Sequence, residues 1–206
     1  MPSSEPQVRD ERSVFLNIPF DEEYASLFLT LLAGLVSLGR TPHSVLEVTS
    51  GGQNRLQRIF ELVASCGASI HDLSRVTLSG PLQVPRFNMP FELGMAYAIA
   101  QRSSHSFFVF EAQPYRLQAS LSDLNGYDPH IHEESRLGVL RCVLDCFGSP
   151  SEAPPISSLN LIVEELTKVV RRVQAEQNLR HPFHPYVFRL AVRAAATIAR
   201  ANRLIE

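Results

Sequence analysis

The chain has 206 residues, a length that suits one domain with an additional segment. Hydrophobic residues make up 45% of it and charged residues 19%, which is typical of a globular core and excludes a wholly disordered chain. The formal net charge of −2 gives the protein no overall electrostatic attraction to nucleic acid or to a membrane surface.

The first predicted elements are a strand and a helix. Residues 1–12 are polar, and we expect them to form a flexible tail. Residues 13–20, SVFLNIPF, are a short apolar run that includes a proline near its end, which predicts a buried strand. From Tyr24 to Val36 the apolar residues recur at the i, i+3, i+4, i+7 spacing of a helix, and Gly39 is the expected C-cap.

Strands and helices continue to alternate after this helix. The predicted elements are, in chain order, a strand at 44–48, a helix carrying Leu56 and Val63, a strand at 68–73, a loop at 74–87, the helix of Glu92, a strand at 105–112, a short helix and an edge strand within 114–135, and a helix at 135–148. The alternation predicts right-handed βαβ units, and therefore a parallel sheet covered by helices on both faces.

The predicted α/β domain covers residues 13–148, and a second part of the chain follows it. Residues 149–158 are rich in proline and serine, which predicts a linker. Two further helices, over 159–179 and about 185–204, form a C-terminal α-helical extension. The first of them carries an apolar stripe that would pack on the domain or form a homo-oligomer.

The predicted topology locates a crevice. A doubly wound five-stranded sheet of order 2-1-3-4-5 binds ligands beyond the carboxyl ends of its strands, between strands 1 and 3. Residues 17–24, residues 71–75 and the start of the Glu92 helix should meet there. The candidate site residues on these stretches are Asn17, Pro19, Phe20, Asp21, Asp72, Arg75, Arg86, Asn88, Met89 and Glu92.

Glu92 has two interpretations. Pro90 suits the first turn of a helix, so that Glu92 would complement the helix dipole by about 0.3–1 kcal/mol. The same location would keep the carboxylate ionised in a poorly solvated crevice. An ionised carboxylate beside a sugar can attack the anomeric carbon or stabilise an oxocarbenium-like transition state. Asp72 would bind the sugar hydroxyls or handle a proton, or it is a turn residue that bonds its own backbone.

Three stretches of the chain resemble a known family. VFLNIPFDEEY, IHDLSR and PRFNMPFELGMAYA are similar to segments of bacterial proteins related to nucleoside 2-deoxyribosyltransferases. That group shares a flavodoxin-like core with nucleotide N-glycosidases and with Toll/interleukin-1 receptor (TIR) domains that cleave NAD. The resemblance covers residues 13–147. It implies that Glu92 is the nucleophile or oxocarbenium stabiliser, that Asp72 holds the ribose, and that residues 17–20 line the base.

The chain departs from that family in one loop. Deoxyribosyltransferases usually carry another acidic residue before their glutamate, whereas residues 73–91 contain none. Arg75 and Arg86 lie in this loop instead, either as surface charges or as ligands of a phosphate. With a phosphate ligand, the substrate shifts from a free nucleoside toward a nucleotide or NAD.

Two function classes follow from these residues. The first is an enzyme that cleaves or transfers the N-glycosidic bond of a nucleoside, nucleotide or NAD, without a cofactor or metal. The second is a nucleotide-signal binding module that relays its state to a partner through the C-terminal helices. No phosphate-binding glycine pattern follows the first strand, because Pro19 stands there. Residues 50–55, SGGQNR, form either a plain turn or an anion site at a helix start.

The remaining features are interpreted as structural. His71 adjoins Asp72 but points to the other side of the strand, which favours a packed histidine over a catalytic base. No His or Cys has further ligands at metal-site spacing, so we expect no metal, and the three cysteines are interpreted as buried small residues. The longest apolar run is shorter than the roughly 20 residues that span a bilayer, and no secretory signal is evident, so a cytoplasmic protein is expected.

The last predicted helix is basic on one face. Arg189, Arg193, Arg200 and Arg203 recur near that face. They form either a solvated surface of a packing helix or a contact surface for a protein or nucleic acid.

Overall fold

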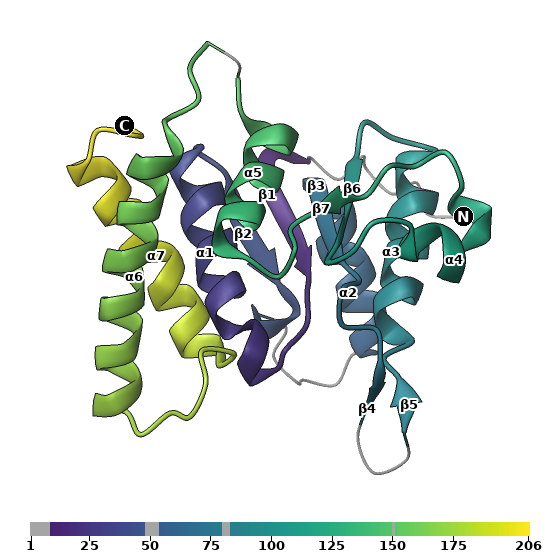
Figure 1. Ribbon diagram of the computed structural model, residues 1–206, viewed down its shortest axis with the longest axis horizontal. Coiled ribbons are helices and arrows are strands. Elements are labelled where there is room, and N and C mark those ends of the chain that lie inside the picture. Colours follow the sequence, from purple (N-terminus) through teal and green to yellow (C-terminus); the bar gives the residue numbers. More distant parts are fainter. Residues whose placement is uncertain (1–8, 48–53, 80–82, 150) are drawn as a thin grey trace, which may run out of the picture.

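The centre of the fold is a five-stranded parallel sheet (Figure 1). The computed structural model describes residues 9–47, 54–79, 83–149 and 151–206. The strands are β1 (Asp10–Asn17), β2 (Thr41–Ser44), β3 (Cys66–Asp72), β6 (Ser106–Glu111) and β7 (His130–Ile131). Their order is β2-β1-β3-β6-β7. This confirms the predicted order 2-1-3-4-5 and the flavodoxin-like α/β fold class.

Helices cover both faces of the sheet. One face is covered by α1 (Ala25–Ser37) and α5 (Arg136–Phe147), and the other by α2 (Arg55–Ser65) and α3 (Asn88–Ala100). Short elements complete the domain: η1 (Glu22–Tyr24), η2 (Val45–Glu47), α4 (Arg116–Ser120), η3 (Ser122–Leu124), and a hairpin of β4 (Leu78–Ser79) and β5 (Val84–Pro85).

The side chains of β1 alternate between the two faces. Val14 and Leu16 belong to the hydrophobic cluster of α1 and α5, whereas Phe15 belongs to the cluster of α2 and α3. All three are fully buried. A parallel strand covered on both sides needs apolar residues at successive positions, which is why residues 13–20 form a continuous apolar run.

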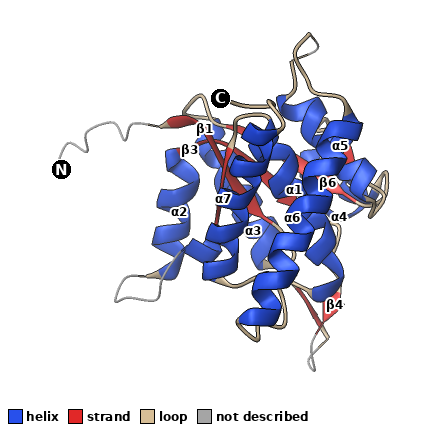
Figure 2. Cartoon of the chain, turned by 90° about the vertical axis from the view of Figure 1, so that its left-hand side faces the viewer, coloured by secondary structure: helices blue, strands red, loops and turns tan. Residues whose placement is uncertain are grey.

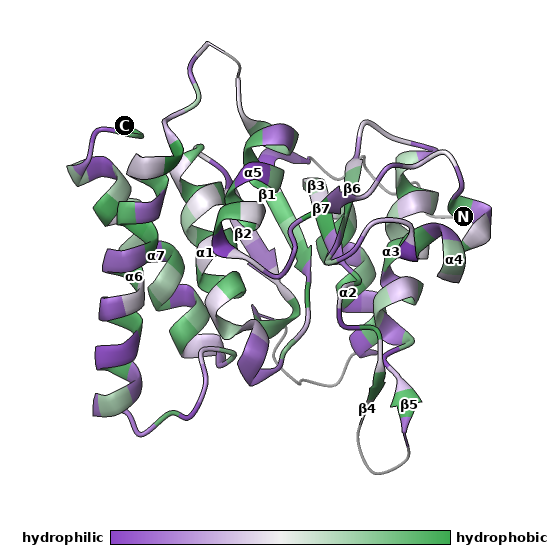
Figure 3. Ribbon diagram, viewed as in Figure 1, coloured by the Kyte–Doolittle hydropathy of each residue, from purple (hydrophilic) through white to green (hydrophobic). Residues whose placement is uncertain are grey.

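The two C-terminal helices extend the layer on the α1 side. They are α6 (Ile156–Glu176) and α7 (Pro185–Ala201), and they lie together in front in Figure 2. Leu159, Ile162 and Phe188 share one hydrophobic cluster with α1 and the sheet. The apolar stripe of α6 therefore packs on α1, while its hydrophilic side faces outward (Figure 3). Covered by α5, α6 and α7, α1 is buried from Leu27 to Ser37.

Several predicted boundaries are wrong. β1 begins at Asp10, inside the segment predicted as a tail, of which residues 1–8 lie outside the described residues. β2 ends at Ser44, where the second strand was predicted to begin. It contains Pro42, which cannot donate a ladder hydrogen bond but is tolerated in an edge strand that pairs only with β1. The predicted loop 74–87 contains the β4–β5 hairpin, and the first three residues of α6, which begins at Ile156, lie inside the predicted linker.

None of the helices in the described ranges combines the length and the apolar character needed to cross a bilayer.

Candidate functional site

A cavity of about 280 Å³ lies beyond the carboxyl ends of β1 and β2. It lies at the predicted edge of the sheet, but the predicted crevice was between strands 1 and 3, and no residue of β3 or of 71–75 lines this cavity. Four separate stretches of the chain form its wall. The lining residues are Leu16, Asn17, Ile18, Pro19, Phe20, Val45, Arg55, Arg86, Asn88, Met89 and Glu92. Seven of the ten predicted site residues therefore meet here, and Asp21, Asp72 and Arg75 do not.

Glu92 occupies a position of α3 that faces the core. It lies between Met89 and Ala96 on the buried side of this helix, and its exposed fraction is only 7%. Glu92 is the fifth residue of α3, because the helix begins at Asn88 and not at Pro90. The first turn of α3 contains no acidic residue, so the interpretation of Glu92 as a capping residue is wrong.

The environment of Glu92 favours its neutral form. Burial raises the pKa of Glu92 to about 7, and the charge of Arg55 offsets part of this rise. Within the described part of the chain, no residue donates a hydrogen bond to its carboxyl group. The expectation that the helix start keeps Glu92 ionised is wrong, because the dipole effect is confined to the first turn. Near neutral pH the protonated and ionised forms therefore coexist.

Asn17 connects the end of β1 to the start of α3. Its Nδ2 donates to the main-chain oxygen of Met89 over 2.8 Å and to Nδ1 of His71 over 3.0 Å. The first bond fixes the turn of α3 that precedes Glu92. Asn17 therefore positions the helix that carries Glu92 and lines the cavity at the same time.

His71 continues this hydrogen-bond chain away from the cavity. Its Nε2 donates to Ser69 Oγ over 2.9 Å, Ser69 donates to Nε2 of His105 over 2.9 Å, and Nδ1 of His105 donates to the Cys66 carbonyl over 2.9 Å. Burial lowers the pKa of His71 to about 3, which keeps the ring neutral. His71 is thus a packed, hydrogen-bonded histidine.

Asp72 does not line the cavity, which corrects its predicted role as a wall beside Glu92. Its side chain is fully buried on the α1 side of the sheet, because Ala68 and Ile70 point to that side and Asp72 follows them along β3. Oδ2 accepts a short hydrogen bond from the Tyr24 hydroxyl and lies 3.2 Å from Nε2 of His132. Oδ1 accepts from the main-chain N–H of Ser74 over 2.9 Å and from the Ser74 hydroxyl.

These partners keep Asp72 ionised. Burial alone would raise the pKa of Asp72, but the hydrogen bond and charge of His132, with the bonds from Ser74 and Tyr24, outweigh it and lower the pKa. The Nδ1 of His132 accepts a hydrogen bond from the main-chain N–H of Glu134 over 3.1 Å, which orients the ring with Nε2 on the side of Asp72. Asp72 therefore ties η1, β3 and the segment after β7 together.

Arg75 forms ion pairs with carboxylates outside the cavity. Its Nε lies 3.0 Å from Oδ2 of Asp21, and its other nitrogens contact Glu23 and, at 3.4 Å, Glu134. The prediction that Arg75 lines the crevice is therefore wrong. Arg86 also binds Asp21, over 2.9 Å, but it lines both the Glu92 cavity and a neighbouring hollow of about 400 Å³. Arg86 is thus the arginine of that loop that stands at the mouth of the cavity.

Arg55 is a site residue that the sequence reasoning missed. It is the first residue of α2, whose N-cap Asn54 accepts a hydrogen bond from Leu56 N over 3.0 Å. The segment 50–55 was interpreted as a turn or an anion site, and residues 50–53 lie outside the described residues. The sequence could have indicated Arg55, because the helix after the second strand begins at the same edge of the sheet as the predicted crevice.

In the described ranges, no group of three or more His, Cys, Asp or Glu side chains is arranged to hold a metal ion. The cavity offers two arginines, two asparagines and one carboxyl among apolar walls, which suits a polar organic molecule. Comparisons of the chain with protein-family models, with curated proteins and with solved structures found no match.

Proposed function

We propose that this protein cleaves or transfers the N-glycosidic bond of a nucleoside, a nucleotide or NAD, with Glu92 as the reacting carboxylate. The observation that carries the proposal is a buried carboxyl group without a hydrogen-bond donor in the described chain, facing a cavity at the ligand-binding edge of the sheet. Such a group destabilises the fold, and carboxyls with strongly shifted pKa values in clefts are typical of functional sites.

The chemistry needs the ionised form of Glu92. Its oxygen bonds to the anomeric carbon, or stabilises the positive charge there, while the C1′–N bond breaks and its electron pair stays on the base nitrogen. Water or an acceptor base then attacks the same carbon and releases Glu92. In hydrolysis, the water supplies the hydroxyl of the sugar and its second proton is lost to solvent or to the base.

The lining favours a base that leaves without a proton. Glu92 is the only acidic side chain among the described lining residues, so they provide no second carboxyl to protonate a departing base. Nicotinamide in NAD is bound through a positively charged nitrogen and leaves as a neutral molecule. Arg55 and Arg86 both line the cavity, and their guanidinium groups are suited to binding a phosphate group. A nicotinamide nucleotide therefore fits the proposal best.

A second candidate, a nucleotide-binding module, is favoured by one contact. Phe20 lines the cavity, and its ring lies 5.4 Å from the ring of Phe183 in the connection between α6 and α7. Phe183 in turn lies 5.1 Å from Phe28 of α1. A ligand that moves Phe20 would therefore press on the C-terminal helices, through which a partner would sense the occupied cavity.

The test compares three substrates and two variants. The purified chain is incubated with NAD, adenosine monophosphate or deoxyadenosine, and the released base is measured by chromatography. We expect release of nicotinamide from NAD, its loss in Glu92→Gln, and unchanged release in Glu61→Gln, an exposed acid of α2 outside the cavity. Saturable binding without release in the wild type would favour the binding module. Release that persists in Glu92→Gln would refute the assignment of Glu92.

The pH profile follows from the pKa of Glu92. Because the ionised form reacts, kcat/KM is expected to rise with pH and to level off above a midpoint of about 7. A rate that instead falls as pH rises through 7 would identify Glu92 as a proton donor and contradict the nucleophilic role.

Arg55 is expected to set that midpoint. Its positive charge lowers the pKa of Glu92, so Arg55→Gln should move the midpoint of the kcat/KM profile to higher pH. Arg141→Gln, an exposed arginine of α5, serves as the control and should leave the profile unchanged. An unshifted midpoint in Arg55→Gln would show that this charge does not act on the reacting group.

A further inference from the structure

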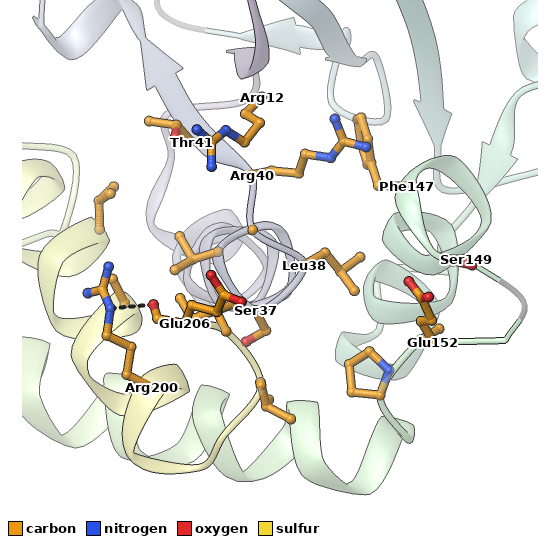
Figure 4. A pocket seen from close by; sticks show the side chains of 18 residues that line it. Arg12, Ser37, Leu38, Arg40, Thr41, Phe147, Ser149, Glu152, Arg200 and Glu206 are labelled. Atoms are coloured by element: carbon orange, nitrogen blue, oxygen red, sulfur yellow. Dashed lines mark hydrogen bonds between the residues drawn. The ribbon is translucent and has the colours of Figure 1, made fainter.

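A second cavity lies at the opposite end of the sheet from Glu92 (Figure 4). Its volume is about 530 Å³, nearly twice that of the Glu92 cavity. Arg12 and Thr41 line it close to the amino ends of β1 and β2, whereas the Glu92 cavity lies at their carboxyl ends. A molecule in this second cavity is therefore remote from the proposed reaction.

One side of this cavity is apolar. α7 ends at Ala201, and Arg203, with a φ of 57°, turns the chain back so that Leu204 N donates to the Ala199 carbonyl over 3.0 Å. The returning segment lies beside the end of α1. The apolar lining residues include Val36, Leu38, Phe147, Val192, Ala196 and Leu204.

Three arginines line the same cavity. Arg40 donates to the Glu11 carbonyl over 3.1 Å and lies over the ring of Phe147, 5.1 Å from its centroid. Arg200 donates through Nε to the main-chain oxygen of Glu206 over 2.7 Å. Within the described chain, the side chain of Arg12 makes no hydrogen bond. None of the three arginines forms an ion pair with a side chain of a described residue. Since each guanidinium has five N–H donors, most of these donors remain for a ligand.

Some of the positive charges around the cavity also stabilise the fold. α1, α5 and α7 all end at its wall, and cations stabilise the carbonyl ends of helices. The lining includes two acidic residues, Glu152 and Glu206, both exposed to solvent. The three arginines outnumber the two acidic lining residues, and Asp10, whose pKa is lowered by a hydrogen bond from Ser13 and in part by the charge of Arg12, balances part of this positive charge.

Ser37, near the end of α1, is a buried polar residue in the wall of this cavity. Its exposed fraction is 1%, it lines the cavity, and its Oγ has no hydrogen-bond partner in the described chain. A buried hydroxyl without a partner is unfavourable, and native structures rarely keep one. The hydroxyl is closed to solvent, so a molecule in the cavity does not reach it in this structure.

We infer that this cavity binds an amphipathic organic anion, that is, a carboxylate or phosphate ester attached to an apolar body. The anionic head contacts Arg12 or Arg40, and the apolar body lies along Val192, Ala196 and the returning C-terminal segment. Bidentate contacts of guanidinium with carboxylate or phosphate supply the specificity for the head. This inference is independent of the reaction proposed for Glu92.

Calorimetric titration of the whole chain tests the ligand class. Octanoate and octyl phosphate represent the two sources of the anionic head, octylammonium reverses the charge, and inorganic phosphate lacks the apolar body. We expect one site per chain with a Kd below about 1 mM for at least one of the two anions. Octylammonium and inorganic phosphate should bind at least about ten-fold more weakly. Absence of saturable binding of both anions, or equal binding of octylammonium, overturns the inference.

Three variants test the location. Arg12→Gln, Arg40→Gln or both should weaken binding of the anion by about ten-fold or more, since a hydrogen bond to a charged group is lost. Arg193 is an exposed arginine of α7 that does not line the cavity, so Arg193→Gln should leave the Kd unchanged. Arg12 is itself exposed, so its replacement leaves the fold intact even if Arg40→Gln disturbs the contact with Phe147. An unchanged Kd in both Arg12→Gln and Arg40→Gln contradicts the assignment.

Discussion

Glu92→Gln is expected to make the protein more stable at pH 8 while abolishing the release of base. The pKa of Glu92 is raised to about 7 in the folded state from its ordinary value of 4.5. A shift of that size corresponds to about 3 kcal/mol of destabilisation when the group is ionised in the folded protein. Glutamine has nearly the same shape without the charge, so Tm at pH 8 should rise by roughly 6–12 °C.

The sign of this effect depends on pH. Below pH 4.5 the carboxyl group is protonated in both the folded and the unfolded chain, so it causes no ionisation penalty. The penalty grows as pH rises from 4.5 to about 7, because only the unfolded chain ionises freely there, and it is complete above 7. The stability gain of Glu92→Gln should therefore be large at pH 8 and vanish near pH 4.

Scanning calorimetry of the wild type, Glu92→Gln and Glu61→Gln at both pH values measures this difference. Glu61 is exposed, and its replacement should change Tm little at either pH. Activity of Glu92→Gln toward NAD should fall by a factor on the order of 10²–10⁴. A lower Tm for Glu92→Gln at pH 8 would show that the carboxylate stabilises the fold, whereas no described residue donates a hydrogen bond to it.

Asp72→Ala is expected to have the largest destabilising effect, about 3–5 kcal/mol of the free energy of unfolding. The substitution removes the buried carboxylate that holds Tyr24, Ser74 and His132, and it leaves their polar groups without this partner. Tyr24→Phe removes only one of these bonds and should cost less, about 1.5–3 kcal/mol. Urea unfolding of both variants measures the two losses.

The same pair of variants separates structure from substrate binding. The pKa of Asp72 is lowered, so its stabilising effect is present above its ordinary value of 3.8 and is lost as pH falls through the lower folded value. Asp72→Ala should therefore differ from the wild type most above pH 4. At temperatures where Asp72→Ala remains folded, its KM for NAD should be unchanged. A strongly raised KM in a folded variant would restore Asp72 to the site that the resemblance implied.

The resemblance and the residue pattern agree on Glu92, yet they differ from the structure on its neighbours. Asn17, Phe20 and Asn88 line the cavity because they follow β1 or open α3, and both segments end at the same edge of the sheet. Arg75 lies only three residues from Asp72 in the sequence, but its side chain forms ion pairs with three carboxylates outside the cavity. The ion pairs of a charged loop residue depend on which side chains the fold brings near it, and the spacing of residues in the sequence does not predict this.

The sequence by itself determined the layers and the strand order of this protein. Continuous apolar runs at 13–20 and 105–112 predicted buried strands by their length and composition, and the helices between the strands predicted parallel pairing, which the sheet confirms. That order also predicted a crevice at the carboxyl ends of the strands, where the cavity lies, although the segment after β3 does not line it. Only the tertiary structure decided which carboxylates enter it. Adjacent residues of β3 point to opposite faces, and α3 packs on the face of His71, so Asp72 lies on the face away from Glu92. The charge state of Glu92 was decided in the same way, because a pKa depends on burial and on the groups in contact, which no local pattern specifies.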